Sequence, residues 1–431
     1  MYTQKKRYAL PGPDDTLRHT LPNGITILAR ENFASPSVII DGYVEVGSED
    51  EVPEKAGLAS LTSDVMERGT KNRSFDELYE EVESVGASFG FGAGTHITSF
   101  GAKGLVAQLP LLLDILNDVL RNPAFSQDQF QHAKNETLID LQELEHSTRR
   151  KAARIFHELA YPEAHPYHRS VLGYQETIAN ITRDELAAFH EKHFAPKGMV
   201  VVVVGAIKAK DAIKAVADTF GDWETSRPAR APLPEVPPLT EITQKRIAIP
   251  EKTQSDLILG WPGPARSSSD FLTCVLANTV LGVFGMMGRL GEKVRSQSGL
   301  AYYAYSRVDG GKGPGPWQAI AGVNPVNVEH ALALILDEIR NIRETKIPED
   351  ELEDSKSYLQ GSLPLRLETN EGVARALTHI ERNALGMDYL QRYQQLINEI
   401  TAEEITAAVQ RWLDPEHYAL AIAGPDDSPN S

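Results

Sequence analysis

Cysteine is almost absent from this 431-residue sequence, in which Cys274 is the only one. A single cysteine cannot form an intramolecular disulfide, and it excludes zinc sites built from several thiolates. This composition suits a reducing compartment, so we expect a cytoplasmic protein, although a periplasmic location stays open. The N-terminal residues MYTQKKRYALPGPDDTLRH carry no apolar stretch, and no secretory signal is expected there.

Long hydrophobic runs and an excess of basic charge are also missing. The longest apolar run, residues 199–204, is far too short to cross a bilayer. Lys and Arg total 43 against 60 Asp and Glu, which gives a formal net charge of −17. Proteins that bind nucleic acid need a basic surface. We therefore expect neither nucleic acid nor membrane as a partner.

What the sequence does contain is enough apolar material for large cores. Hydrophobic residues make up 41% of the chain, which excludes wholesale disorder. At roughly 100–200 residues per domain, the length predicts two to four domains. Residues 226–240 read SRPARAPLPEVPPLT, and such proline-rich sequence forms an extended connector. It divides the chain into predicted domains 1–225 and 241–431, unless it is a surface loop within one domain.

The two predicted domains end in similar sequences. Residues 181–207 and 400–425 align without a gap, so that Gly205 matches Gly424. Each segment has a Thr N-cap, an amphipathic helix, a Pro-containing turn and a short apolar strand. This repeat predicts an α+β fold of two homologous domains, each a mixed, mostly antiparallel sheet packed with helices.

A second pair of blocks supports the repeat. Residues 109–142 and 329–360 both show the pattern of a helix, a short break and a long helix. In the first domain we expect that long helix to run over residues 126–159. Two colinear blocks make a chance similarity a poor explanation.

Two motifs of catalytic type stand in the wrong context. Ser88 lies in a G-x-S-x-G sequence, but a nucleophile elbow follows a strand and opens a helix, and the expected order here is reversed. The glycine-rich segment 310–315 has Gly313 where a P-loop needs Ser or Thr. We expect a turn and a flexible loop. The histidine pairs His165/His168 and His190/His193 are expected to pack or cap rather than bind metal.

Several blocks in a fixed order resemble the pitrilysin/insulinase-type zinc peptidases. They include Leu21-Pro-Asn-Gly-Ile25, Glu67-Arg-Gly-Thr70 and His165-Pro-Tyr167 in the first half. In the second half, Gly288-Arg-Leu290 is followed by VRSQSGLAY, which ends at Tyr302. The resemblance is to the half-length bacterial and mitochondrial-processing-peptidase-like branch, and it spans nearly the whole chain.

The chain departs from this family at the zinc motif. Active members carry H-x-x-E-H on a helix, where two histidines one turn apart reach one zinc and the glutamate activates water. Here Ser60 and Asp64 stand at the histidine positions and Ser63 at the glutamate position. Aligned with the family, the later glutamate ligand falls at Asp140. We therefore expect no metal and no cofactor in this chain, with zinc held by a partner subunit.

The signature of the second domain is intact. The resemblance implies that Arg295 and Tyr302 lie across the cleft from zinc. A tyrosine O–H can donate to a developing oxyanion, and an arginine can hold backbone or carboxylate oxygens. The alternative is that Arg295 is an ordinary surface residue and Tyr302 a core aromatic.

These observations predict a non-catalytic subunit of a heterodimeric zinc metallopeptidase that degrades or processes peptides. It would supply Arg295 and Tyr302 to the zinc site of an H-x-x-E-H partner and be inactive alone. One alternative is a purely structural or peptide-binding homologue, similar to respiratory-complex core proteins. Another is a chain that pairs with itself, as a homodimer whose chamber only holds peptides.

Overall fold

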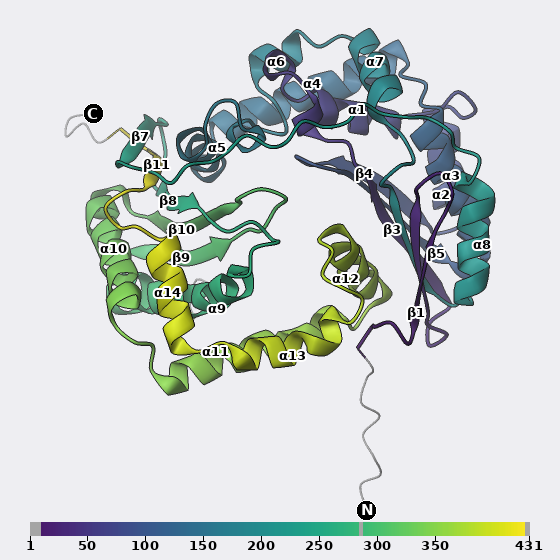
Figure 1. The fold of residues 1–431 in the computed structure, drawn as a ribbon. Coiled ribbons are helices and arrows are strands. Elements are labelled where there is room, and N and C mark those ends of the chain that lie inside the picture. The colour runs from purple at the N-terminus through teal and green to yellow at the C-terminus, as the bar shows by residue number, and fades with distance from the viewer. Residues whose placement is uncertain (1–9, 284–287, 427–431) are drawn as a thin grey trace, which may run out of the picture. The chain divides into compact units, whose positions relative to one another are not determined.

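The computed structural model describes residues 10–283 and 288–426 and contains two compact units (Figure 1). Unit 1 comprises Met1–Lys134, Asn180–Arg230 and Gln360–Gln395. Unit 2 comprises Asn135–Ala179, Ala231–Leu359 and Leu396–Ser431. Each unit combines segments from both halves of the sequence, so the packing units differ from the sequence repeats 1–225 and 241–431.

Unit 1 is built on sheet 1, which among the described residues has six strands in the order β1-β2-β6-β3-β5-β4. β2 and β6 are parallel, and the other neighbours are antiparallel. β6 is buried throughout because its sequence VVVVVG is apolar on both faces. The strands are β1 (Thr16–Thr20), β2 (Thr26–Glu31), β3 (Ser37–Val44), β4 (Ser88–Ala93), β5 (Thr98–Leu105) and β6 (Val200–Gly205).

Helices cover sheet 1 through contacts with several of its strands. α3 contacts β5, α8 contacts β2, and α12 contacts β3 and β6. Ser74 and Glu77 cap α2 in the reciprocal way that the sequence S-x-x-E predicts. The helices of unit 1 include α1 (Leu58–Met66), α2 (Phe75–Glu83), α3 (Leu109–Arg121), α7 (Arg183–His193), α8 (Ala209–Phe220) and α12 (Asn370–Arg382).

Unit 2 is built on sheet 2, which in the described part of the chain has five strands in the order β7-β11-β8-β10-β9. The strands are β7 (Thr243–Ala248), β8 (Ser255–Pro262), β9 (Ala301–Val308), β10 (Pro316–Val323) and β11 (Ala419–Gly424). Its helices include α5 (Thr148–Ala160), α6 (Gln175–Ala179), α9 (Phe271–Gly282), α10 (Val328–Glu344) and α14 (Ala402–Trp412). Three helices have residues in both units: α4 (Gln127–Glu145), α11 (Glu349–Arg366) and α13 (Tyr389–Glu399).

The two sheets repeat the same topology. The order β2-β6-β3-β5-β4 of sheet 1 matches β7-β11-β8-β10-β9 of sheet 2 strand by strand. In each sheet the first of these pairs is parallel and the others are antiparallel. Gly205 ends β6 and Gly424 ends β11, as the sequence repeat requires. The predicted α+β fold of two homologous domains is confirmed.

Two helices are exchanged between the halves of the chain. α5 comes from the first half but contacts β8 and β11 of sheet 2, as Figure 1 shows. Its Phe156 is fully buried in a cluster with Ile258 and Ala421. In the equivalent place, α12 of the second half packs Val373 and Leu377 against β2 and β6 of sheet 1. Each sheet therefore has one apolar face covered by a helix from the other half.

The exchange depends on a helix end that sequence analysis missed. The single long helix expected over residues 126–159 is wrong, because the structure ends α4 at Glu145 and starts α5 at Thr148. The side chain of Ser147 accepts a hydrogen bond from the Arg150 N–H at 3.3 Å and caps the new helix. A serine N-cap inside a polar helical pattern gives little warning of such a break.

The proline-rich segment 226–240 forms neither helix nor strand. Its beginning is fixed to unit 1 by two arginines. Arg227 pairs with Glu45, and Arg230 pairs with Glu49 at 2.5 Å and with Asp50. Because the side chains of both carboxylates that bind Arg230 are buried, removing this arginine would leave them without a guanidinium partner.

The packing of α12 makes a stability prediction. Leu377 is fully buried against sheet 1, whereas Leu365 on α11 is 73% exposed. We expect Leu377→Ala to lower the free energy of unfolding by about 2–5 kcal/mol, because a cavity remains under the helix. Leu365→Ala is the matched control and should change it by less than about 0.5 kcal/mol. Urea unfolding of both variants measures this, and equal small effects would contradict the packing of α12 on sheet 1.

Candidate functional site

The helix that carries the altered zinc motif is held by a buried carboxylate. α1 begins after Gly57, whose φ of 95° lies in the left-handed region. Both oxygens of Glu51 accept backbone N–H groups at this helix start, from Gly57 at 3.0 Å and from Ala59 at 2.9 Å. A negative charge at a helix N-terminus is favoured by the helix dipole. This contact fixes the start of α1.

The side chains on α1 differ in type from the ligands of a zinc site. Ser60 is half-buried, and Ser63 is buried with no hydrogen-bond partner for its hydroxyl. Asp64 forms an ion pair at 3.1 Å with Arg68, which lies just beyond the end of the helix. Zinc sites use imidazole, thiolate and carboxylate ligands, and a serine hydroxyl replaces neither histidine nor a general base. Among the described residues, no group of three or more His, Cys, Asp or Glu is arranged to hold a metal ion.

Asp140, at the position of the later ligand, lies on α4 in the part that belongs to unit 2. Both of its oxygens accept hydrogen bonds from the Arg150 guanidinium, at 2.9 and 2.8 Å. These hydrogen bonds hold the pKa of the Asp140 carboxyl below its usual range. The carboxylate is therefore engaged in a bidentate ion pair within its own unit.

Arg295 and Tyr302 are joined by a tight turn in unit 2. Arg295 lies half-buried in the helical turn η5 (Gly291–Gln297), which Val294 anchors in the core. The chain then reverses at Gly299, which has a φ of 64° and donates its N–H to the Arg295 carbonyl at 3.0 Å. Leu300 donates to the Val294 carbonyl at 3.1 Å, and β9 begins one residue later.

Tyr302 occupies a β-bulge. β9 pairs with β10 so that Tyr303 faces Gly322 and Ala301 faces Val323, which leaves Tyr302 without an opposite residue. The side chain of Tyr302 is 67% exposed, so the alternative of a core aromatic is wrong. β9 is also an edge strand of sheet 2. Bulges at sheet edges redirect side chains and are common beside active sites.

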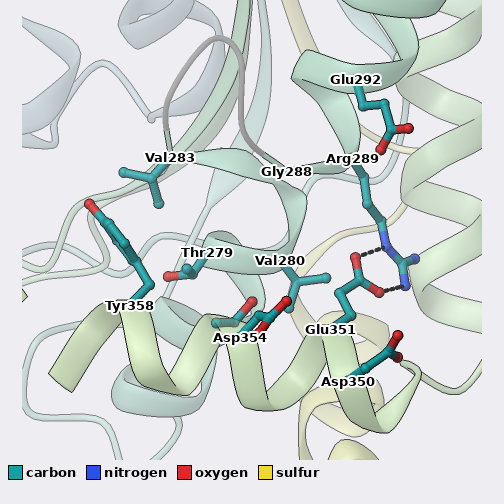
Figure 2. Close-up of a pocket in the computed structure, with 11 residues that line it drawn as sticks. Thr279, Val280, Val283, Gly288, Arg289, Glu292, Asp350, Glu351, Asp354 and Tyr358 are labelled. Atoms are coloured by element: carbon teal, nitrogen blue, oxygen red, sulfur yellow. Dashed lines mark hydrogen bonds and ion pairs between the residues drawn. The ribbon is translucent and has the colours of Figure 1, made fainter. Parts of the chain in front are cut away.

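A pocket of about 320 Å³ lies in unit 2 next to the Gly288-Arg-Leu290 segment (Figure 2). Arg289 forms a bidentate ion pair with Glu351 across it, at 2.8 and 2.6 Å. The lining is Thr279, Val280, Val283, Gly288, Arg289, Glu292, Asp350, Glu351, Asp354, Ser355 and Tyr358. Four carboxylates against one guanidinium favour a cationic rather than an anionic group. Neither Arg295 nor Tyr302 lines this pocket.

One ionisable residue beside α1 was missed by sequence analysis. Glu67 follows the last residue of α1, and burial raises the pKa of its carboxyl to about 7. Its Oε2 accepts the backbone N–H of Phe91 on β4 at 3.0 Å. The sequence motif Glu67-Arg-Gly-Thr70 contains this residue but does not reveal its burial. Only the packing of α1 on β4 shows it.

The G-x-S-x-G sequence at Ser88 and the glycine-rich segment 310–315 do not have the structural context of a nucleophile elbow or a P-loop. Ser88 starts β4 after α2 and a turn at Gly86, which has a φ of 66°, so a helix precedes the serine and a strand follows it. This order is the reverse of a nucleophile elbow. In the glycine-rich segment, the Gly313 N–H donates to the Tyr167 hydroxyl at 3.2 Å. That amide is engaged by a protein side chain instead of a phosphate.

Comparison with known proteins places both halves in one family. Residues 26–173 match the family model described as Insulinase (Peptidase family M16), and residues 180–359 match the model described as Peptidase M16 inactive domain. The chain belongs to peptidase family M16. These two matches confirm the resemblance drawn from the ordered motifs.

Two relatives align with this M16 chain over most of its length. It is 27% identical over 418 residues to the Bacillus subtilis protein named uncharacterized zinc protease YmxG, covering 95% of this chain and 98% of that protein. It is 23% identical to the mitochondrial-processing peptidase subunit beta of Lentinula edodes, covering 94% and 89%. A crystal structure of a peptidase M16 inactive domain from Pseudomonas fluorescens has the same fold, with a TM-score of 0.88, 24% identity and coverage of 96% and 98%.

The described residues include no helix that is both long and apolar enough to cross a membrane.

The composition of α1 predicts the metal content of the protein. We expect protein dialysed against metal-free buffer to hold far less than one zinc per chain, because Ser60, Ser63, Asp64 and Asp140 cannot replace two imidazoles and two glutamates. Elemental analysis measures this, with an H-x-x-E-H relative prepared in parallel as the positive control. Stoichiometric zinc that disappears in Asp64→Ala would contradict the assignment.

Proposed function

We propose that this M16 chain is the non-catalytic subunit of a heterodimeric zinc peptidase and acts on peptides only together with an H-x-x-E-H partner. The observation that carries the proposal is Tyr302. Its phenol is exposed in a bulge on a sheet edge, in a chain whose own motif helix carries no histidine. An exposed aromatic held by a bulge and a glycine turn is explained by contact with something outside the unit.

The chemistry expected of Tyr302 is hydrogen-bond donation. When water attacks a peptide carbonyl, negative charge develops on the carbonyl oxygen, and a fixed O–H donor stabilises it. The bulge and the turn at Gly299 restrict the backbone on both sides of Tyr302, which reduces the entropy lost on positioning the donor. Zinc and the activated water would come from the partner subunit.

Arg295 would bind the peptide substrate. Its role would not be limited to the negative charge that develops in the transition state. Its guanidinium stands on η5, seven residues before Tyr302, and offers several fixed N–H donors to carbonyl or carboxylate oxygens. Such contacts act on bound substrate and transition state alike, so they strengthen binding as well as turnover.

A second candidate function is peptide binding without catalysis, and the sheet edges favour it. β4 ends sheet 1 and β9 ends sheet 2, so each presents backbone groups on one side that no other strand of the described residues pairs with. An extended peptide can add to such an edge through main-chain hydrogen bonds. This function needs neither Tyr302 nor a zinc-bearing partner, and the variants described next distinguish the two.

Removing the phenol oxygen should impair the assembled enzyme. In a complex with the H-x-x-E-H subunit of the same organism, we expect Tyr302→Phe to lower kcat by ~10²–10³, because one oxyanion donor is lost. Arg295→Ala should raise KM and lower kcat together. Tyr305→Phe is the matched control on the same strand, since the Tyr305 hydroxyl is engaged by Arg149 at 2.5 Å within unit 2. Steady-state peptide hydrolysis measures all three.

Assembly has to be checked in the same samples. Size-exclusion chromatography of each variant with the partner should show an unchanged complex, so that a loss of turnover reports chemistry. Full activity of the Arg295→Ala/Tyr302→Phe double variant would exclude the subunit role and leave the peptide-binding or structural function.

A further inference from the structure

β4 forms a free edge of sheet 1 in the described part of the chain. β5 is the one strand that pairs with β4 among the described residues. The Gly94 N–H donates to the Ile97 carbonyl at 2.7 Å, and in an antiparallel pair such bonding alternates along the strand. Gly90 and Gly92 therefore point their backbone groups toward β5, while Phe89, Phe91 and Ala93 point theirs toward the open side.

Of these outward groups, the Phe91 N–H is already occupied. It donates at 3.0 Å to the Glu67 carboxyl, which reaches it from the end of α1. Phe89 and Ala93 form no outward backbone hydrogen bond within the described part of the chain.

We propose that Glu67 is an edge cap, a side chain that occupies the central outward N–H of β4 and that a docking peptide strand must displace. The proposal rests on the proposed function only in taking a peptide as the ligand of this edge. A strand laid along β4 needs the Phe91 N–H for its ladder, because the neighbouring outward donors are those of Phe89 and Ala93, two residues away on either side. The Glu67 carboxyl and the carbonyl of an incoming strand compete for the same Phe91 N–H.

The surroundings of Glu67 make this competition depend on pH. Asp64 and Arg68 face it from α1 and the residues just after the helix, and Tyr79 faces it from α2. Burial raises the pKa of Glu67 from 4.5 to about 7, and Asp64 adds to the shift, while Arg68 and the Phe91 hydrogen bond oppose it. The Glu67 carboxyl therefore binds its proton more tightly in the capped state than in the displaced, hydrated state.

The direction in which pH changes the stability of the cap follows from the two pKa values. Below pH 4.5 both states are protonated, and the cap has its full stability. As pH rises through 7, the buried carboxyl must ionise, and displacement to water becomes easier. A pKa of about 7 when capped and 4.5 when hydrated predicts that displacement is roughly 20- to 30-fold easier at pH 8 than at pH 5.5. Peptide affinity for the edge should rise by that factor.

Hydrogen exchange tests the cap without any ligand. In the full chain, Glu67→Ala should lower the protection factor of the Phe91 amide by roughly tenfold, with the change confined to residues 88–93. Glu67→Gln keeps an acceptor oxygen and should retain protection that no longer varies between pH 5.5 and 8. Glu80→Ala, which removes an exposed carboxylate from α2, is the control and should leave the Phe91 amide unchanged. Equal protection in wild type and Glu67→Ala would overturn the proposal.

A binding measurement separates the cap from the proposed function. The probe is a fluorescein-labelled synthetic peptide of residues 97–106, the sequence that pairs with β4 on its other side. Wild type should bind it more tightly at pH 8 than at pH 5.5, and Glu67→Ala should bind tightly at both. If exchange responds to Glu67→Ala but no protein binds the probe, the cap stands and peptide docking at this edge is contradicted. If all variants bind equally at both pH values, the cap is contradicted and peptide binding stands.

Discussion

The burial of one apolar sheet face in each unit by a helix from the other half of the chain underlies this structure. Val202 and Leu28 of sheet 1 are fully buried, and the residues that cover them come from α12, more than 160 positions further along the sequence. Ile258 of sheet 2 is covered in the same way by Phe156 of α5. A sheet with a solvated face of this composition is not stable, so each half of the chain needs the other to fold.

The two groups of candidate residues lie in different units. α1, with Ser60, Ser63 and Asp64, belongs to unit 1, whereas the bulge with Tyr302 belongs to unit 2. α1 carries no histidine, yet Glu51 holds its start, while the turn and bulge leave Tyr302 exposed. This contrast supports the proposal that the chain completes the site of another subunit.

Sequence reasoning predicted the repeat but not the way its elements pack. The gap-free match of Gly205 with Gly424 was enough to predict two sheets of the same topology, because local strand, turn and helix patterns carry that information. It could not predict that α5 leaves its own half, since the Ser147 cap is a local signal and the destination of the helix is a long-range one. The bulge at Tyr302 and the burial of Glu67 likewise depend on partners distant in sequence, β10 and β4.

The central claim is that this chain is inactive alone and completes the zinc site of a partner. It is tested most directly by hydrolysis of a quenched fluorescent peptide by the purified chain, by the H-x-x-E-H subunit of the same organism, and by an equimolar mixture of the two. The account predicts background rates for each protein alone and strong hydrolysis by the mixture, abolished by a zinc chelator. Full activity of the zinc-bearing subunit alone, unchanged when this chain is added, would contradict it.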